Sequence, residues 1–295
     1  MRSHRPLAVS LASIAAVGAA VAVTGPAVAI NSYNAAPAPE RTETGAFVAL
    51  WDTSGDGVAD RFDWVCSGAM ADDDTYLTAA HCTDDWPAGT RFFVSLEQDF
   101  QRLLDTTPGS PDEQAAALLA DGRVVEGDPH QDPGYPGNSA DSHDIGVLDF
   151  ADRAVTPADV WEFTPATLPA AGELGALGSR ALDAADWTVV GYGTQEAANG
   201  KGGHTHSGGG VRMKATVDFD ALNPTWVRLA MNEARDLGGA CYGDSGGPNF
   251  AAIGGELVLA GVTVTGDSPC YATNVVYRTD TPSARAFLGD FVDLP

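Results

Sequence analysis

Basic side chains are scarce in this sequence. Its 295 residues include 16 Lys and Arg against 40 Asp and Glu, so the formal net charge is −24 at pH 7. An acidic surface repels phosphate backbones and anionic headgroups. We therefore expect a soluble monomer, with no nucleic acid and no stable membrane association among its partners.

Long hydrophobic runs are almost absent, and the one that occurs lies at the start of the chain. Residues 1–29 open with two arginines, are apolar over residues 7–23 and end in Ala27-Val28-Ala29. That order is typical of a signal peptide with a small-residue cleavage site, so we expect residues 1–29 to be removed and the protein to be secreted. An uncleaved membrane anchor is the alternative, because the run approaches spanning length, but Gly25-Pro26 favours cleavage.

Cysteine is also rare, with four residues: Cys66, Cys82, Cys241 and Cys270. Four cysteines in an exported chain favour two disulfides, and the sequence alone leaves three connectivities open. A zinc site is the competing interpretation. It is disfavoured because the spacings are not those of C-x-x-C pairs and no histidine lies at ligand spacing from more than one cysteine.

The rest of the chain is typical of an all-β protein. Residues 30–45 lack apolar periodicity and indicate a propeptide or a flexible lead-in, whereas from Phe47 onward short apolar runs alternate with turn residues. Residues 257–264 predict one strand and residues 211–217 another. The second alternates between an apolar face (Val211, Met213, Ala215, Val217) and a polar face (Arg212, Lys214, Thr216).

One helix is well indicated, near the C-terminus. Asp280 or Thr281 can cap it, and Pro282 suits its first position. Residues 101–122 look inserted and include a stretch of helical composition at residues 113–120.

The hexapeptide Gly243–Pro248 carries the clearest chemistry, because it places the Ser245 hydroxyl on a glycine-flanked turn. A serine hydroxyl is a weak nucleophile, so it needs a base and a group that orients the base. His81 and Asp144 supply them, in the chain order His, Asp, Ser. His143 is disfavoured as the base, because adjacent strand residues point to opposite faces.

On these motifs the sequence resembles the chymotrypsin-like (trypsin family, S1) serine endopeptidases of the secreted bacterial type, over roughly residues 45–295. The resemblance implies an all-β fold of two antiparallel six-stranded β-barrels with a C-terminal α-helix. Residues 46–156 would form the first barrel, and residues 157–295 the second barrel and the terminal helix. It also implies the disulfides Cys66–Cys82 and Cys241–Cys270.

The implied activity is hydrolysis of peptide bonds through an acyl-enzyme intermediate, with no cofactor required. His81 takes the Ser245 proton, Asp144 orients the imidazole, and the N–H groups of Gly243 and Ser245 bind the oxyanion. Polypeptides are then the substrates, and proteinaceous inhibitors are further expected partners. Two alternatives stay open: a catalytically silent binding protein on the same fold, and an esterase that uses the same triad.

The resemblance also bears on substrate preference. The base of the pocket for the side chain before the scissile bond falls on Gly239, so the aspartate of trypsins is absent. Gly266 lies where the wall strand offers its backbone to an extended substrate, and Asn274 and Val275 lie where that wall usually has glycine. We expect Val275 to narrow the pocket, and small or medium apolar side chains to be preferred to Lys or Arg.

Activation is the feature in which the sequence departs from the family. There Asp244 pairs with a newly liberated Ile or Val N-terminus, which makes the precursor a zymogen. Here no Ile-Val-Gly-Gly motif precedes Cys66 at the expected distance, where Arg41 and Thr42 lie instead. Ile30 becomes the N-terminus after signal cleavage, but it lies too early in the sequence for that role.

Two further motifs suggest metals. An EF-hand-like loop at residues 52–63 has acids or a hydroxyl at loop positions 1, 3, 5, 9 and 12, namely Asp52, Ser54, Asp56, Asp60 and Asp63. Structural calcium is the weaker interpretation and an acidic hairpin turn the stronger, because position 12 is Asp and no helices flank the loop. His204 and His206 could also bind a metal, although a glycine-rich loop more often leaves such histidines exposed.

Overall fold

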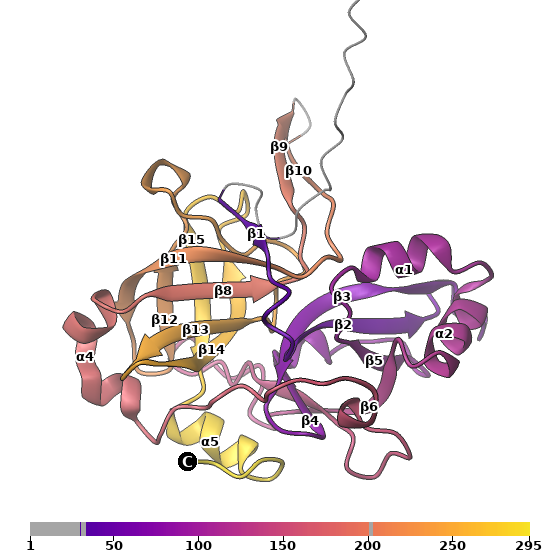
Figure 1. Ribbon diagram of the computed structural model, residues 1–295, viewed down its shortest axis with the longest axis horizontal. Helices are drawn as coiled ribbons and strands as arrows, with labels where there is room; N and C mark the ends of the chain where they lie inside the picture. The colour runs from indigo at the N-terminus through magenta and orange to yellow at the C-terminus, as the bar shows by residue number, and fades with distance from the viewer. Residues whose placement is uncertain (1–29, 31–33, 201–202) are drawn as a thin grey trace, which may run out of the picture.

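The computed structural model describes residue 30, residues 34–200 and residues 203–295. Two β-barrels lie side by side, the first purple and the second orange to yellow in Figure 1. Both are closed and antiparallel with six strands each, and a helix lies near the C-terminus. The predicted fold class is therefore confirmed.

The first barrel brings two loops to one end. Its strands in spatial order are β2 (Thr44–Trp51), β3 (Arg61–Met70), β4 (Thr75–Thr78), β7 (Gly146–Asp149), β6 (Val125–Gln131) and β5 (Arg91–Ser95). Alternate side chains fill its interior, as the period of two along a strand requires. Thr78, the last residue of β4, pairs with Gly146, the first of β7. The residues that follow β4 and those that precede β7 therefore lie together.

The second barrel carries the hexapeptide. Its strands in spatial order are β8 (Trp187–Gly191), β11 (Met213–Leu222), β12 (Trp226–Ala230), β15 (Thr273–Arg278), β14 (Glu256–Gly266) and β13 (Pro248–Ile253). Strand β13 pairs with β8 and closes the barrel. Residues 243–247 lie immediately before β13. The hairpin of β9 (Glu196–Gly200) and β10 (Gly203–Ser207) projects from this barrel in Figure 1.

Short helices lie outside the barrels. They are α1 (Phe100–Thr106), α2 (Pro111–Ala120), α3 (Pro157–Val160), α4 (Glu173–Asp183) and α5 (Pro282–Leu288). Helix α2 covers the stretch predicted from composition, and Ser110 and Glu113 form a capping box at its start. Thr281, rather than Asp280, caps the predicted helix α5 by accepting the N–H of Ala284. Among the described residues, no helix is long and apolar enough to cross a membrane.

The segment before the first barrel is packed where its sequence suggested flexibility. Residues 36–37 form strand β1 (Ala36–Pro37), which pairs with β11 of the second barrel, and Ala38 is buried. Over these residues the lead-in thus pairs with the second barrel, and its interpretation as a propeptide or a flexible segment stays a prediction. Cleavage within residues 30–45 stays a prediction.

Arg212 corrects the predicted strand pattern. It was expected on the polar outer face, but it is 3 % exposed. Its guanidinium donates to the carbonyl oxygens of Ala38, Thr44 and Leu96 at 3.0, 2.9 and 3.0 Å. Burying a charged group is tolerated when its donors are satisfied. Arg212 therefore joins the lead-in and the first barrel to the second barrel.

All four cysteines are paired, as the resemblance implied. Cys66 is bonded to Cys82, and Cys241 to Cys270. Each disulfide lies beside one part of the candidate site.

Candidate active site

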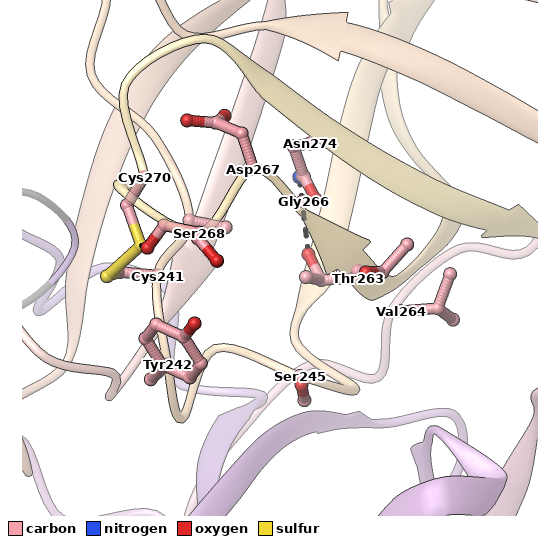
Figure 2. Close-up of a pocket in the computed structure, with 12 residues that line it drawn as sticks. Cys241, Tyr242, Ser245, Thr263, Val264, Gly266, Asp267, Ser268, Cys270 and Asn274 are labelled. Carbon is pink, nitrogen blue, oxygen red and sulfur yellow. Dashed lines mark hydrogen bonds between the residues drawn. A yellow bond between two sulfur atoms is a disulfide. The ribbon is translucent and has the colours of Figure 1, made fainter. Parts of the chain in front are cut away.

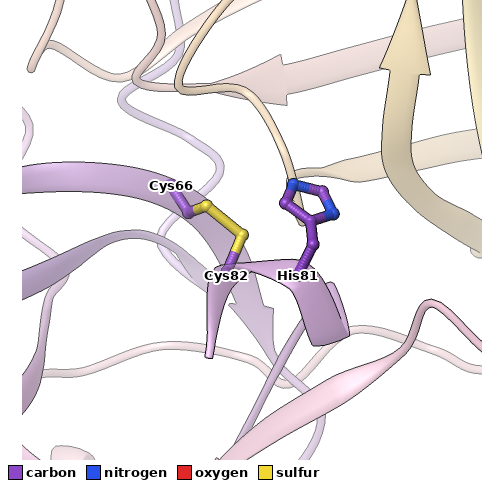
Figure 3. Close-up of side chains that lie close together, drawn as sticks. All are labelled: Cys66, His81 and Cys82. Carbon is purple, nitrogen blue, oxygen red and sulfur yellow. A yellow bond between two sulfur atoms is a disulfide. The ribbon is translucent and has the colours of Figure 1, made fainter. Parts of the chain in front are cut away.

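His81 follows the end of strand β4 in the short turn η1 (Ala80–Cys82), which the Cys66–Cys82 disulfide ties to β3 (Figure 3). The imidazole Nδ1 lies 2.9 Å from Oδ2 and 3.2 Å from Oδ1 of Asp144. The backbone N–H of His81 donates to the same carboxylate at 3.0 Å. Because an ionised carboxylate only accepts hydrogen bonds, Nδ1 holds the proton and Nε2 is left with a lone pair.

The neighbouring His143 has a different partner. Its Nδ1 lies 3.0 Å from Oδ2 of Asp132. Asp144 is buried at 8 % exposure, and its carboxylate is engaged by His81. The two adjacent residues 143 and 144 therefore belong to separate hydrogen-bonded pairs.

The Ser245 segment is attached to the first barrel through Ser67, which sequence reasoning did not identify. The Ser67 N–H donates to the carbonyl oxygen of Ser245 at 2.8 Å, and its hydroxyl donates to that of Gly243, also at 2.8 Å. The same hydroxyl accepts the N–H of Tyr192 at 2.9 Å. The position of Ser67, directly after Cys66 in the sequence, was the only indication available.

Gly246 allows this segment to approach the His81 loop. A Cβ atom at residue 246 would lie 2.0 Å from Oγ1 of Thr78 and 2.8 Å from the backbone nitrogen of Ala79. Its φ of +76° also favours glycine. Ser245 is therefore adjacent to a contact with the residues that lead into His81, so the fold brings Ser245, His81 and Asp144 to one region between the barrels.

Asp244 is fully buried, with 0 % exposure. Its Oδ1 accepts the N–H of Gly193 and its Oδ2 that of Cys241, both at 2.8 Å. Burial raises the pKa of Asp244 to about 7, against the opposing effect of these two hydrogen bonds. Within the described part of the chain, Asp244 forms no ion pair.

A cavity of about 310 Å³ opens beside Ser245 (Figure 2). Its buried end includes Ala240, Thr263, Cys270 and Asn274, whereas its rim includes Tyr242, which is 54 % exposed. Gly266 lines it, as expected from the wall strand.

Two of the predicted pocket residues do not line this cavity. Gly239 packs against Met231, whose Sδ would lie 2.1 Å from a Cβ at residue 239. Val275 instead lines a second cavity, of about 280 Å³, together with Asp144 and Trp226. Asn274 lines the cavity at the position where Val275 was expected to narrow it. The two residues are neighbours on one strand, so their side chains face opposite sides.

The zinc interpretation can be compared with the positions of the cysteine and histidine side chains. Among the residues that the structure describes, two groups of histidine and cysteine atoms lie close enough together to hold an ion, namely Cys66, His81 and Cys82, and His206, Cys241 and Cys270. Their sulfur atoms are in disulfides, so they offer no thiolate and the zinc interpretation does not fit. The side chain of His204 lies outside the described residues.

The acidic loop joins strands β2 and β3. The Asp52 carboxylate accepts the N–H groups of Ser54, Gly55 and Gly57, and Asp60 accepts from Thr53. These hydrogen bonds lower the pKa of both carboxyl groups, that of Asp52 chiefly through Gly57 and that of Asp60 chiefly through the Thr53 hydroxyl. The contacts are those of a hairpin turn, and calcium binding stays a prediction.

A family model and a curated protein both match this chain. The sequence model described as Trypsin matches residues 40–287. The chain belongs to the trypsin family. A curated relative, the kallikrein 1-related peptidase-like b4 of Mus musculus, is 28 % identical over 213 residues, which cover 70 % of this chain and 72 % of that protein. The bacterial type suggested by the sequence stays a prediction.

Proposed function

We propose that this trypsin-family protein is a secreted serine endopeptidase that acts through Ser245, His81 and Asp144. The observation that carries the proposal is the contact of 2.9 Å between His81 and a buried Asp144, in the region that holds Ser245 and its cavity. Acyl transfer needs an imidazole that is held by a carboxylate in the same region as a nucleophilic serine. The proposal includes polypeptides as substrates and residues 1–29 as a signal peptide that directs secretion.

Each group then has a definite task. The Nε2 atom of His81 accepts the Ser245 proton as Oγ attacks the substrate carbonyl, and later returns a proton to the leaving amine. Asp144 keeps the imidazole in the required tautomer and stabilises its charged form. The backbone N–H groups of Gly243 and Ser245 are the donors proposed for the oxyanion. Water then hydrolyses the acyl-enzyme.

Covalent labelling tests this function against its alternatives. We expect a serine-directed phosphonate to add its phosphonyl group to Ser245 of the purified protein, detected by peptide mass spectrometry, and we expect casein to be cleaved. The absence of an adduct would favour a silent binding protein. Labelling with ester hydrolysis but no cleavage of casein would favour an esterase.

We also propose that Ile30 is the activating N-terminus. Its side chain is fully buried in the core of the second barrel, in a cluster that includes Met213 and Ala240. Ala240 lies four residues before Asp244 in the sequence. The distance along the sequence had argued against Ile30, but burial in this barrel supports it. An ammonium group paired with the Asp244 carboxylate also offsets the cost of burying that charge.

N-terminal sequencing of the active protein is expected to begin at Ile30. As a matched comparison, a form that carries one additional glycine before Ile30 is expected to lose most of its activity, because the ammonium is displaced while the fold is kept. Full activity of the extended form, or an active protein that begins at Thr42, would contradict the proposal.

A further inference from the structure

We propose that the cavity beside Ser245 selects a neutral primary amide, the side chain of Gln or Asn, as the residue before the scissile bond. The proposal rests on the proposed endopeptidase function and defines its substrate class. It derives from three buried polar residues at the inner end of the cavity: Asn274, Thr263 and Asn249. The first two line the cavity, and Asn249 lies behind them.

The hydrogen bonds among these residues fix the orientation of both amides. The Nδ2 of Asn249 donates to the carbonyl oxygen of Gly247 at 3.2 Å and to the Thr263 hydroxyl at 2.9 Å. A carbonyl oxygen only accepts, so the Oδ1 of Asn249 must face Asn274. Asn274 in turn must present its Nδ2 to that oxygen, at 2.9 Å.

The oxygen of Asn274 is therefore the atom left without a partner. Asn274 is 1 % exposed, and its Oδ1 is buried without a hydrogen bond. A buried acceptor that lacks a donor is unfavourable, so a ligand N–H that reaches it gains binding free energy. Figure 2 shows Asn274 beside Thr263 at one side of the cavity, joined by the hydrogen bond from Nδ2 to Oγ1.

Thr263 supplies the complementary group. Its hydroxyl oxygen accepts N–H groups from Asn249 and Asn274, at 2.9 and 3.3 Å, so its own proton is left to donate. Among the hydrogen bonds of Asn249, Thr263 and Asn274 in the described part of the chain, none uses the Thr263 hydroxyl as a donor. One acceptor beside one donor matches the N–H and C=O of a primary amide.

Other side chains fit this end of the cavity less well. Lys and Arg need a free carboxylate, but Asp267 at the cavity already accepts the N–H groups of Tyr271, Ala272 and Thr273. Glu and Asp bring a charge that no described cavity residue neutralises. Leu and Met leave the oxygen of Asn274 unpartnered. The preference for apolar side chains expected from Val275 loses its basis, because Val275 does not line this cavity.

Peptides that differ only in the residue before the scissile bond test the proposal. We expect kcat/KM for Gln to exceed that for Glu, Leu and Lys by about tenfold or more. In Asn274→Leu, which keeps the side-chain volume but removes the acceptor, the Gln-to-Leu ratio of kcat/KM should fall by about tenfold. Thr263→Val, which keeps Oδ1 of Asn274, should lower the same ratio by less.

The outcomes separate the two proposals. Labelling of Ser245 together with a preference for Leu or Lys, or a Gln-to-Leu ratio unchanged in Asn274→Leu, would overturn the amide preference alone. No labelling and no cleavage of any peptide would overturn the endopeptidase function. If Asn274→Leu does not fold, the wild-type ratios decide by themselves.

Discussion

Replacing Ser245 by alanine is expected to lower kcat/KM for peptides by a factor on the order of 10⁴–10⁶. Without Oγ no acyl-enzyme forms, and the imidazole that Asp144 holds by a hydrogen bond has no hydroxyl to deprotonate. Steady-state hydrolysis of a peptide substrate measures the loss, and an unchanged melting temperature shows that the fold is intact. Residual activity above about one hundredth of the wild type would contradict the role of Ser245.

The two histidines near Asp144 provide a matched control. His81→Ala should lose activity on the same scale as the serine variant, because it removes the base. His143→Ala removes an equally large side chain from the neighbouring pair with Asp132, and should retain most of the activity. Equal losses in the two variants would indicate general damage to the loops rather than loss of a base.

Replacing Asp244 by asparagine is also expected to lower turnover strongly. Each carboxylate oxygen accepts a backbone N–H, from Gly193 and Cys241, so an amide must place its own N–H₂ against one of them. The segment that carries the Gly243 N–H then loses its anchor. Loss of one oxyanion donor lowers turnover by about 10²–10³, and we expect an effect of this size in kcat with a smaller change in KM. Activity within about threefold of the wild type would exclude this role of Asp244.

The same residue makes a prediction for the uncut chain. Burial raises the pKa of Asp244 from its ordinary 3.8 to about 7, so between these values the folded state binds a proton that the unfolded state lacks. The stability contributed by this group is complete below about pH 4 and is lost as the pH rises through about 7. Urea unfolding across this range should show the decline in the uncut chain and not in Asp244→Asn. Pairing with the Ile30 ammonium should lower the pKa and remove the decline.

The sequence indicated which residues form the candidate site, but it indicated little about the residues that surround them. Ser245, His81 and Asp144 stood in motifs whose residue types and order are typical of acyl transfer, and the two barrels followed from the resemblance. Their roles await the variants above. The neighbours were harder to predict because each depends on pairing between distant strands. Ser67 contacts Gly243 across 176 positions of sequence.

Errors in the prediction have physical causes. Arg212 was expected at an outward position of a strand, but it precedes β11 and is buried, and three carbonyl oxygens from other segments accept its N–H groups. Val275 was expected to line the cavity beside Ser245, but Asn274 lines it instead. The strand register decides which face of the strand each residue occupies, and it cannot be read from the local sequence pattern. Helix α4 was not predicted from the sequence, and the structure shows a break in it at Gly178, where φ is +71°.

The contacts of Arg212 make the two barrels interdependent during folding. Neither half satisfies this guanidinium alone, since its acceptors belong to β2, to the residue after β5 and to the lead-in. A chain in which only one barrel has formed holds an unsatisfied cation or three unpaired carbonyl groups, and both are unfavourable. Unfolding should therefore be a single cooperative transition rather than two. The region that holds Ser245, His81 and Asp144 then assembles only when both barrels have formed.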